Sequence, residues 1–330
     1  MKIKLAVGYG SICGGCDVAF IDLGEKLIDL TELVDIVFWP ALVDTKEEDL
    51  RKLKEIDVGM FFGAIRTDKH KATLELLREK ARLLVAFGTC ACYGGVLGLA
   101  NAARSMDLLK TGYVITKSTE NPKQILPGLE KLEGIPISIP KIRSLVSPIS
   151  DFVDVDIWVP GCPPPVDSII KLLDVLKDYQ RGHLPPKGLF IAEDRSLCEF
   201  CDREKPEVLQ IEKFRRVHEG KIDEKECLLK QGILCLGPVT RGGCGARCIK
   251  ANMPCRGCFG PVPNVEDQGT KFITAVAAAL KAGEEREVGE EELKKLIEEI
   301  HDPLGLFYMF SLAASIINRK YLDLGGDEDE

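Results

Sequence analysis

The 330-residue sequence predicts an α/β protein, in which a parallel-sheet domain is followed by an irregular, cysteine-rich domain with C-terminal helices. Strand and helix patterns alternate along the first half, which is typical of a parallel sheet with helices on both faces. The alternation stops after residues 181–187, and most of the thirteen cysteines then lie between Cys198 and Cys258. We therefore place the two domains at residues 1–185 and 186–330.

Short apolar runs bounded by turn residues predict the strands of the first half. These runs are residues 2–8, 35–39, 57–62, 83–87 and 155–159. Apolar residues at helical spacing predict the helices between and after them. These helices are expected over residues 18–33, 67–82 and 166–179, the last one following consecutive prolines that suit a helix start.

The second half lacks this alternation of strand and helix patterns. Residues 235–263 hold too few large apolar side chains for a core of their own, so we expect metal sites to staple this region. Helices are expected over residues 271–282 and 290–301. The apolar segment 306–317 is expected to pack back on the body or on a partner, and the acidic end 325–330 to be solvated.

Composition and charge limit the classes of function. With 45% hydrophobic and 29% charged residues, the chain has the composition of an ordinary globular protein. Its net charge of −8 and pI of about 5.3 argue against a nucleic-acid partner. No apolar run approaches the roughly 20 residues that span a bilayer, and no apolar or twin-arginine leader precedes the first strand. We therefore expect a cytoplasmic protein without a membrane partner.

The thirteen cysteines separate into three sets of four and one remainder, Cys92. The first set is Cys13, Cys16, Cys90 and Cys162. The second set is Cys198, Cys201, Cys227 and Cys235. The third set is Cys244, Cys248, Cys255 and Cys258. Because a reducing cytoplasm prevents most disulfides, CxxC pairs indicate metal or redox sites. Four soft thiolates bind either zinc or an iron–sulfur cubane, and spacing alone leaves both open.

The first set has a defined place on the predicted sheet. Cys13 and Cys16 follow the first strand, Cys90 follows the fourth, and Cys162 follows the fifth. Open α/β sheets hold their ligands just beyond the carboxyl ends of their strands, so these cysteines are expected to converge on one crevice. The glycines around them allow the backbone to approach a cluster closely.

Three motifs together resemble the small subunit of [NiFe] hydrogenases: CGGC at residues 13–16, GTCACYGG at 88–95 and GCPPP at 161–165. The runs CLGPVTRGGCGARC (235–248) and PCRGCFGP (254–261) resemble the cytoplasmic methyl-viologen-reducing, deazaflavin-non-reducing branch of methanogens and their relatives. The resemblance covers nearly the whole chain. It implies a flavodoxin-like first domain, in which the first cysteine set holds the proximal [4Fe–4S] cluster beside the nickel–iron centre of a separate large subunit.

The resemblance also implies which clusters the other two sets hold. The second set matches the distal cluster, where many relatives have a histidine in place of Cys198, so this site would be all-thiolate. The third set matches the medial cluster. Many relatives have a proline in the fourth medial position and a three-iron cluster, whereas here Cys248 supplies a fourth thiolate. We therefore expect three [4Fe–4S] clusters, although Cys235 and Cys244 could exchange roles between the distal and medial sites.

The expected function is electron transfer in a cytoplasmic [NiFe] hydrogenase complex. By the resemblance, electrons from H2 oxidation on the large subunit pass through the proximal, medial and distal clusters. The acceptor is a small [2Fe–2S] subunit that feeds a heterodisulfide reductase complex. The chain itself offers no nickel site and no catalytic residue, and it has neither a GxGxxG motif after a strand nor a Walker loop for a nucleotide.

Three other interpretations share some of these features. The gamma subunit of a deazaflavin-reducing hydrogenase would have the same fold and clusters but a flavoprotein acceptor. A quinone-reductase subunit of the respiratory type has an adjacent cysteine pair near its start, unlike the spaced Cys13 and Cys16. A zinc-stapled scaffold would use the same thiolates without redox chemistry. Visible absorption and acid-labile sulfide separate zinc from iron–sulfur clusters.

Several single residues have simpler readings. We expect Cys92 to be a small buried hydrophobe in its turn, with a contact behind a ligand or a role in oxygen tolerance as the alternative. Asp17 is expected to place a charge at a helix N-terminus, with proton movement as the alternative. The four histidines, His70, His183, His218 and His301, stand outside the cysteine sets and are expected to be surface or capping residues.

Overall fold

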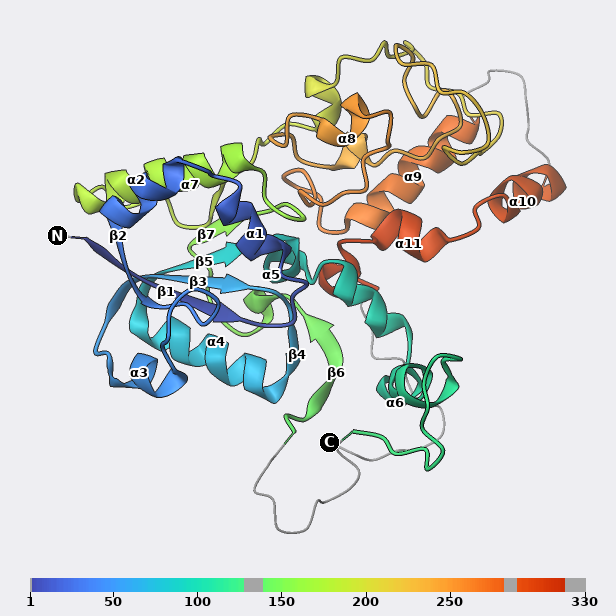
Figure 1. Cartoon of the computed structure of the whole chain (residues 1–330). Coiled ribbons are helices and arrows are strands. Elements are labelled where there is room, and N and C mark those ends of the chain that lie inside the picture. The colour runs from blue at the N-terminus through green and yellow to red at the C-terminus, as the bar shows by residue number, and fades with distance from the viewer. Residues whose placement is uncertain (1, 128–138, 282–289, 318–330) are drawn as a thin grey trace.

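A parallel sheet forms the centre of the first half of the molecule (Figure 1). The computed structural model describes residues 2–127, 139–281 and 290–317. Within these residues six strands form the sheet, in the order β2-β1-β3-β5-β7-β8, and each neighbouring pair is parallel. The strands are β1 (Ile3–Tyr9), β2 (Val34–Phe38), β3 (Ile56–Phe62), β5 (Ala81–Phe87), β7 (Ile157–Val159) and β8 (Leu189–Phe190). The predicted parallel sheet is confirmed, with β8 as an additional strand.

Helices cover both faces of this sheet, as the sequence predicts (Figure 1). One face carries α1 (Gly15–Ile21), α2 (Lys26–Leu33) and α7 (Val166–Gln180). The other carries α3 (Glu47–Lys52), α4 (Asp68–Lys80) and α5 (Thr89–Tyr93). Because successive side chains of a strand point to opposite faces, Met60 joins the core under α1 and α7, whereas Phe61 joins the core under α4. The central strands β1, β3 and β5 are therefore mostly apolar, and each carries one charged residue near its start.

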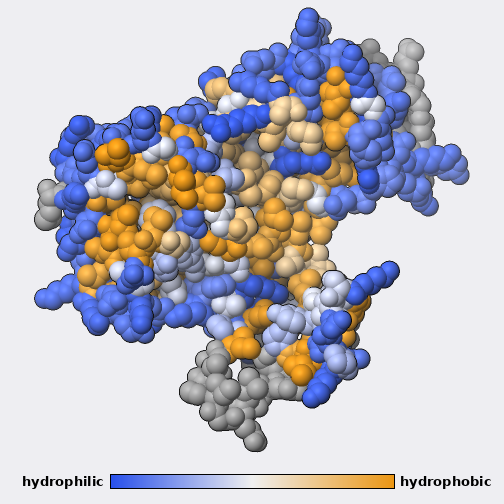
Figure 2. Space-filling model, in the orientation of Figure 1, coloured by the Kyte–Doolittle hydropathy of each residue, from blue (hydrophilic) through white to orange (hydrophobic). Residues whose placement is uncertain are grey.

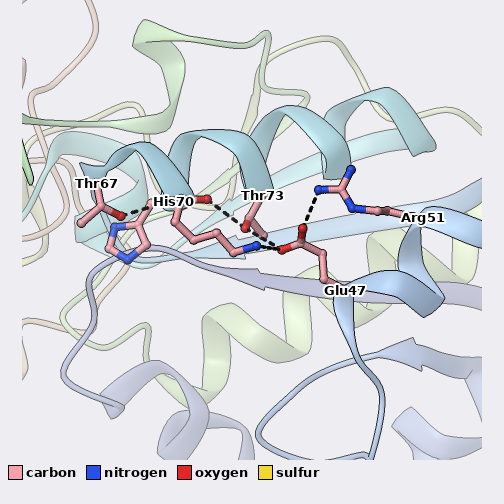
Figure 3. Close-up of polar contacts among 6 residues, drawn as sticks. Glu47, Arg51, Thr67, His70 and Thr73 are labelled. Atoms are coloured by element: carbon pink, nitrogen blue, oxygen red, sulfur yellow. Dashed lines mark hydrogen bonds and ion pairs between the residues drawn. The ribbon is translucent and has the colours of Figure 1, made fainter. Parts of the chain in front are cut away.

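Polar contacts tie α3 to α4 below the sheet (Figure 3). Glu47, the first residue of α3, accepts hydrogen bonds from Lys69 and from the hydroxyl of Thr73, the latter at 3.4 Å. The hydroxyl of Thr67 caps α4 by accepting the His70 backbone amide at 3.2 Å. His70 thus belongs to the capped first turn of a helix, as expected for a histidine outside the cysteine sets.

One predicted helix and one apolar segment are each divided into shorter helices in the structure. The single helix expected over residues 18–33 is two helices, α1 and α2, because Gly24 adopts a positive φ of 57° in the turn between them. The apolar segment 306–317 is also interrupted, and forms part of α11 (Pro303–Tyr308) and the short helix η6 (Leu312–Ala314). This segment does pack back on the body. A Cβ added to Gly94 would lie 2.3 Å from the Cβ of Ala313.

The sequence patterns did not predict several elements in the first half of the chain. Strands β4 (Ile65–Thr67) and β6 (Ile142–Ser147) pair antiparallel beside the main sheet. The helices η1 (Val96–Ala102), α6 (Ser105–Lys110), η2 (Thr111–Ile115) and η3 (Ile149–Asp151) also lie there. In Figure 1, α6 projects away from the sheet, and no residue of α6 or η2, all of which are described, is buried.

The second half combines loops with a few helices. The short helices are η4 (Leu197–Phe200), η5 (Gly237–Val239) and α8 (Arg247–Lys250), and the longer ones are α9 (Gln268–Lys281) and α10 (Glu290–Glu298). Its core is built largely by α9 and α11, through Phe272 and Phe307, and by loop residues such as Phe214. The cysteine-bearing loops thus pack against helices outside residues 235–263. Residue 282, where α9 was expected to end, and the acidic end 325–330 lie outside the described residues.

The two halves meet near residue 190. Strand β8 lies beyond residue 185, and Ile191 belongs to the core of the sheet domain, so the first half reaches at least that far along the chain. The boundary between residues 185 and 186 stays a prediction. None of the helices in the described parts of the chain has the length and apolar character needed to cross a bilayer.

Candidate metal centres at three cysteine sets

The first cysteine set lies at the carboxyl edge of the sheet. Cys13 is in the loop after β1, and Cys16 is in the first turn of α1. Cys90 is in the first turn of α5, directly after β5, and Cys162 follows β7. The strand order reverses direction between β1 and β3, which is where sheets of this type leave a ligand crevice.

Backbone hydrogen bonds hold the loops at this edge together. Gly10 donates to the Phe62 carbonyl at 2.7 Å, which joins the loops after β1 and β3. The Thr89 amide donates to the Gly161 carbonyl at 2.9 Å, and the Gly88 amide donates to the Val159 carbonyl at 2.8 Å. These bonds join the loop of Cys90 to the loop of Cys162, so the ligand positions are set by the sheet below them.

The four thiols of the first set lie close enough to influence one another. Burial, and then the thiols of Cys90, Cys162 and Cys13, raise the pKa of Cys16 above its ordinary value. Burial, Cys162 and Cys13 raise the pKa of Cys90 to about 12. Cys13 and Cys162 are exposed, whereas Cys16 and Cys90 are half-buried. A cationic group bound between the four thiols would favour their thiolate forms.

Two glycines shape the space around these thiols. A Cβ added to Gly88, whose φ is +86°, would lie 2.6 Å from the Sγ of Cys16. A Cβ added to Gly95, whose φ is +60°, would lie 2.5 Å from the Sγ of Cys90. Any larger residue at either position would therefore collide with a thiol and would also strain the backbone. The glycine-rich loops are thus matched to a site that brings sulfur close to the main chain.

The second set gathers at one end of the loop-rich half. Cys198 lies in η4, Cys201 follows it, and Cys227 and Cys235 come from later loops. Burial, and then the thiols of Cys235, Cys227 and Cys201, raise the pKa of Cys198 to about 12. The Cβ of an alanine at Gly237 would lie 3.1 Å from the Sγ of Cys198. The pKa of Cys198 thus responds to the other three thiols, which places the four cysteines in one region.

The third set gathers around Cys258. Burial, and then the thiols of Cys244 and Cys248, raise the pKa of Cys258 to about 12. Burial, and then the thiols of Cys235 and Cys258, raise the pKa of Cys255 well above its ordinary value. Cys248 is exposed on α8, and its pKa is raised by burial and by Cys244. The structure thus groups Cys244 with the third set and Cys235 chiefly with the second.

Two contacts show how the three sets are ordered in space. The Sγ of Cys235, in the second set, accepts the backbone amide of Cys255, in the third, at 3.3 Å. The backbone amide of Cys162, in the first set, hydrogen-bonds Cys258, in the third, and lowers the pKa of that thiol against the effect of burial. The third set therefore lies between the other two.

The donor chemistry of each set fits an iron–sulfur cluster. Each offers four sulfur atoms on loops that contain glycine, and no histidine or carboxylate is needed to complete it. Across residues 2–127, 139–281 and 290–317, no three His, Cys, Asp or Glu side chains form a group that could hold a single metal ion. The structure places the cysteines of each set in one region of the fold, and their roles as cluster ligands stay a prediction.

The remaining single residues behave largely as expected. Cys92 is 1% exposed, and its Sγ lies 3.4 Å from the Ala86 carbonyl oxygen, as expected for a buried residue in the turn. Asp17 does lie in the first turn of α1. His70 is half-buried, and the other three histidines, all within the described residues, are exposed.

Four side chains form hydrogen bonds near the cysteine sets and were not identified from the sequence. The hydroxyl of Tyr9 and the indole Nε1 of Trp39 both donate to Asp17. The buried hydroxyl of Thr89 reaches the third set, and that of Thr240 lies among the third-set loops. For Thr89, its position between Gly88 and Cys90 was a signal in the sequence. The other partners come from distant segments and left no local signal.

Comparisons with known proteins agree with this geometry. Residues 13–176 match the family described as NADH ubiquinone oxidoreductase, 20 Kd subunit. The chain is 38% identical to the iron-sulfur subunit of the F420-non-reducing hydrogenase of Archaeoglobus profundus, over 97% of this chain and 99% of that one. It is 37% identical to the corresponding subunit of the F420-non-reducing hydrogenase of Methanothermobacter marburgensis, over 97% of both chains.

A solved structure shows a similar fold. A reduced, active form of the Ni-Fe-Se hydrogenase from Desulfomicrobium baculatum aligns with a TM-score of 0.51 and 19% sequence identity. The alignment covers 80% of this chain and 96% of that one. The fold is therefore shared across both halves, while the sequence identity in this comparison is too low to carry residue roles.

Proposed function

This chain belongs to the small subunits of [NiFe] hydrogenases, in the branch of the F420-non-reducing enzymes, and we propose that it carries electrons from a catalytic large subunit to an iron–sulfur acceptor. It is part of an oxidoreductase complex, and no catalytic site is assigned to the chain itself. The observation that carries the proposal is the order of the three cysteine sets, with the third between the first and the second.

We assign one [4Fe–4S] cluster to each set. Cys13, Cys16, Cys90 and Cys162 would hold the proximal cluster, Cys244, Cys248, Cys255 and Cys258 the medial one, and Cys198, Cys201, Cys227 and Cys235 the distal one. When bound, such clusters accept and release single electrons at potentials set by their ligands, hydrogen bonds and burial. The chain's own contribution would be to hold twelve cysteine side chains in three neighbouring sets and to donate backbone amides to some of them, as Cys255 does to Cys235.

An apolar surface beside the first set supports a partner at that end. Helix α1, which carries Cys16, exposes Val18 at 54% and Ile21 at 61% of their surface. Ile28 on α2 is 63% exposed. Figure 2 shows hydrophobic side chains gathered where α1 and α2 lie in Figure 1. Apolar side chains grouped in this way are typical of a protein interface. We assign this surface to the large subunit, which would bring the nickel–iron centre close to Cys13 and Cys162.

At the other end we propose an electron acceptor next to the second set. The names of the two relatives above state that they do not reduce F420, so we favour a small [2Fe–2S] subunit and a heterodisulfide reductase complex over a deazaflavin-reducing partner. We also propose a cytoplasmic location, because thiolate clusters suit a reducing compartment.

The metal content of the purified chain tests this proposal. The complex is isolated without oxygen, and iron, zinc and acid-labile sulfide are measured per polypeptide after subtraction of the partners. Three cubanes require about twelve iron and about twelve sulfide atoms. Two or three zinc ions without sulfide would show that the cysteines staple the fold, and the proposed function would be wrong.

A further inference from the structure

The side chain of Thr89 joins three segments that carry candidate ligands. It lies between Gly88 and Cys90, and it is 1% exposed. Its hydroxyl donates to the carbonyl oxygen of Cys258 at 2.7 Å and accepts the amide of Gly161 at 3.1 Å. One buried hydroxyl therefore contacts the loops of Cys90, Cys162 and Cys258. The first two loops belong to the first set, and the last belongs to the third.

The loop that follows Thr89 makes close contacts with two other segments. A Cβ added to Gly260, next to the third set, would lie 2.2 Å from the ring of Tyr93, which follows the first-set residue Cys90. A Cβ added to Gly98 would lie 3.0 Å from the Cβ of Ala313. The loop after β5 thus presses closely on both the third set and the C-terminal segment. Such contacts leave little freedom for the two halves to slide past each other.

A second hydrogen bond crosses the same junction. The backbone of Cys162 also forms a hydrogen bond with the side chain of Cys258. Gly161, the residue before Cys162, donates its backbone amide to the Thr89 hydroxyl. Two consecutive residues of the first-set loop are therefore linked to Cys258. Cys162 contacts it directly, and Gly161 is linked to it through the Thr89 hydroxyl.

We propose that Thr89 is the positioning residue of the junction between the first and third cysteine sets, and that it fixes the separation of the groups they hold. This inference rests on the proposed function, because the separation matters only if both sets hold redox clusters. Thr89 acts through the loops and not as a ligand. Its two hydrogen bonds use both capacities of a hydroxyl, so a residue without one leaves a buried donor and a buried acceptor unpaired.

The junction between the second and third sets provides a matched comparison. Thr240 is also 1% exposed, and its hydroxyl donates to the carbonyl of Leu236 at 2.6 Å and accepts from Gln268 at 2.9 Å. It lies beside the contact between Cys255 and Cys235. A Thr240→Val change therefore removes a buried hydroxyl of the same type from the other junction.

Amide hydrogen exchange in the full complex measures how well the amides at the junction between the first and third sets are protected. Within residues 160–165, PGCPPP, only Gly161 and Cys162 carry a backbone amide, and both face the junction. We expect Thr89→Val to speed exchange in this segment by about tenfold or more, because a buried hydrogen bond is lost. Thr89→Ser, which keeps the hydroxyl, should exchange like the unmodified chain. Thr240→Val should leave this segment unchanged.

A second readout follows the clusters without measuring turnover. In the reduced complex, the magnetic interaction between the clusters of the first and third sets should weaken in Thr89→Val and persist in Thr89→Ser and Thr240→Val. If Thr89→Val does not assemble, the smaller Thr89→Ala carries both measurements, since it also lacks the hydroxyl. The inference is wrong if the variants without the hydroxyl match Thr89→Ser in exchange and in magnetic coupling while their iron content is normal. A complex with zinc and no sulfide would instead contradict the proposed function.

Discussion

The hydroxyl of Tyr9 donates to the Oδ1 of Asp17 at 2.5 Å, and so links the last residue of β1 to the residue after the candidate ligand Cys16. The indole Nε1 of Trp39 donates to the same oxygen at 3.0 Å and to the Tyr9 hydroxyl at 2.7 Å. Trp39 is fully buried. Asp17 is therefore more than a charge at a helix N-terminus, because it fastens α1 to the sheet at the position where α1 presents Cys16.

We predict that Asp17→Ala loosens this attachment. Hydrogen bonds to a charged group contribute about 1.5 to 3 kcal/mol to the free energy of unfolding. In the variant, the indole N–H of Trp39 keeps only its hydrogen bond to the Tyr9 hydroxyl. The thermal unfolding midpoint of the complex, followed anaerobically by circular dichroism, should fall by several degrees. Asp22→Asn is the control, since Asp22 is exposed at the other end of α1. Equal midpoints for the two variants would contradict the structural role of Asp17.

The sequence predicts the sheet and the first cysteine set because both depend on local patterns. Apolar runs mark the strands, and the carboxyl-edge rule then collects Cys13, Cys16, Cys90 and Cys162 without any long-range information. The split between α1 and α2 was missed, because a single glycine in a turn overrides an apolar pattern of helical spacing. Gly24 supplies the positive φ that ends the helix.

The junctions between the sets could not be predicted in the same way. The contact between Thr89 and Cys258 joins residues 169 positions apart and depends on how two halves with separate cores pack together. The contact between Cys235 and Cys255 is similar, because a thiol accepts an amide of a neighbouring loop. No periodic pattern in the sequence predicts such contacts between separate segments. The family resemblance implied the order of the three sets, but the contacts that produce this order are seen only in the folded chain.

Gly88 provides a test of the space around the first set. In Gly88→Ala the new methyl group would lie 2.6 Å from the Sγ of Cys16, in addition to the strain of a φ of +86°. We expect this variant to lose about four iron atoms per chain, the content of one cubane. Gly14→Ala is the matched control, because Gly14 has a similar φ of +88° and nothing within 4 Å of the added Cβ. Full iron in Gly88→Ala would show that the loops can move apart.

We predict that Cys248 decides the type of the proposed medial cluster. It lies exposed on α8, and the thiols of Cys244 and Cys248 both influence Cys258. We expect Cys248→Ser to convert a four-iron medial cluster to a three-iron one, with the loss of about one iron atom per chain and a new paramagnetic signal in the oxidised state. Cys92→Ser serves as control, because Cys92 is buried outside the three sets. A medial site that retains four irons in Cys248→Ser would remove this residue from the ligand set.

Ile21 tests the surface that we assign to the large subunit. The side chain is 61% exposed on α1, the helix that begins beside Cys13 and carries Cys16. Replacing it by lysine places a charge in a contact that the proposal buries, and an unpaired buried charge costs several kcal/mol. Co-purification of the large subunit, measured by a pull-down from cells that express both chains, should fall at least about tenfold.

The control for this experiment lies in the second half of the chain. Val208 is 64% exposed, nearly the same fraction as Ile21, and belongs to a loop after the second-set residue Cys201. Val208→Lys should leave the large subunit bound, because the proposal places that partner at the first set. Since both residues are exposed, neither change is expected to disturb folding, and circular dichroism of the two variants checks this. Retention of the large subunit by Ile21→Lys would move the interface away from α1, and with it the electron entry point that Cys13 and Cys162 are proposed to form.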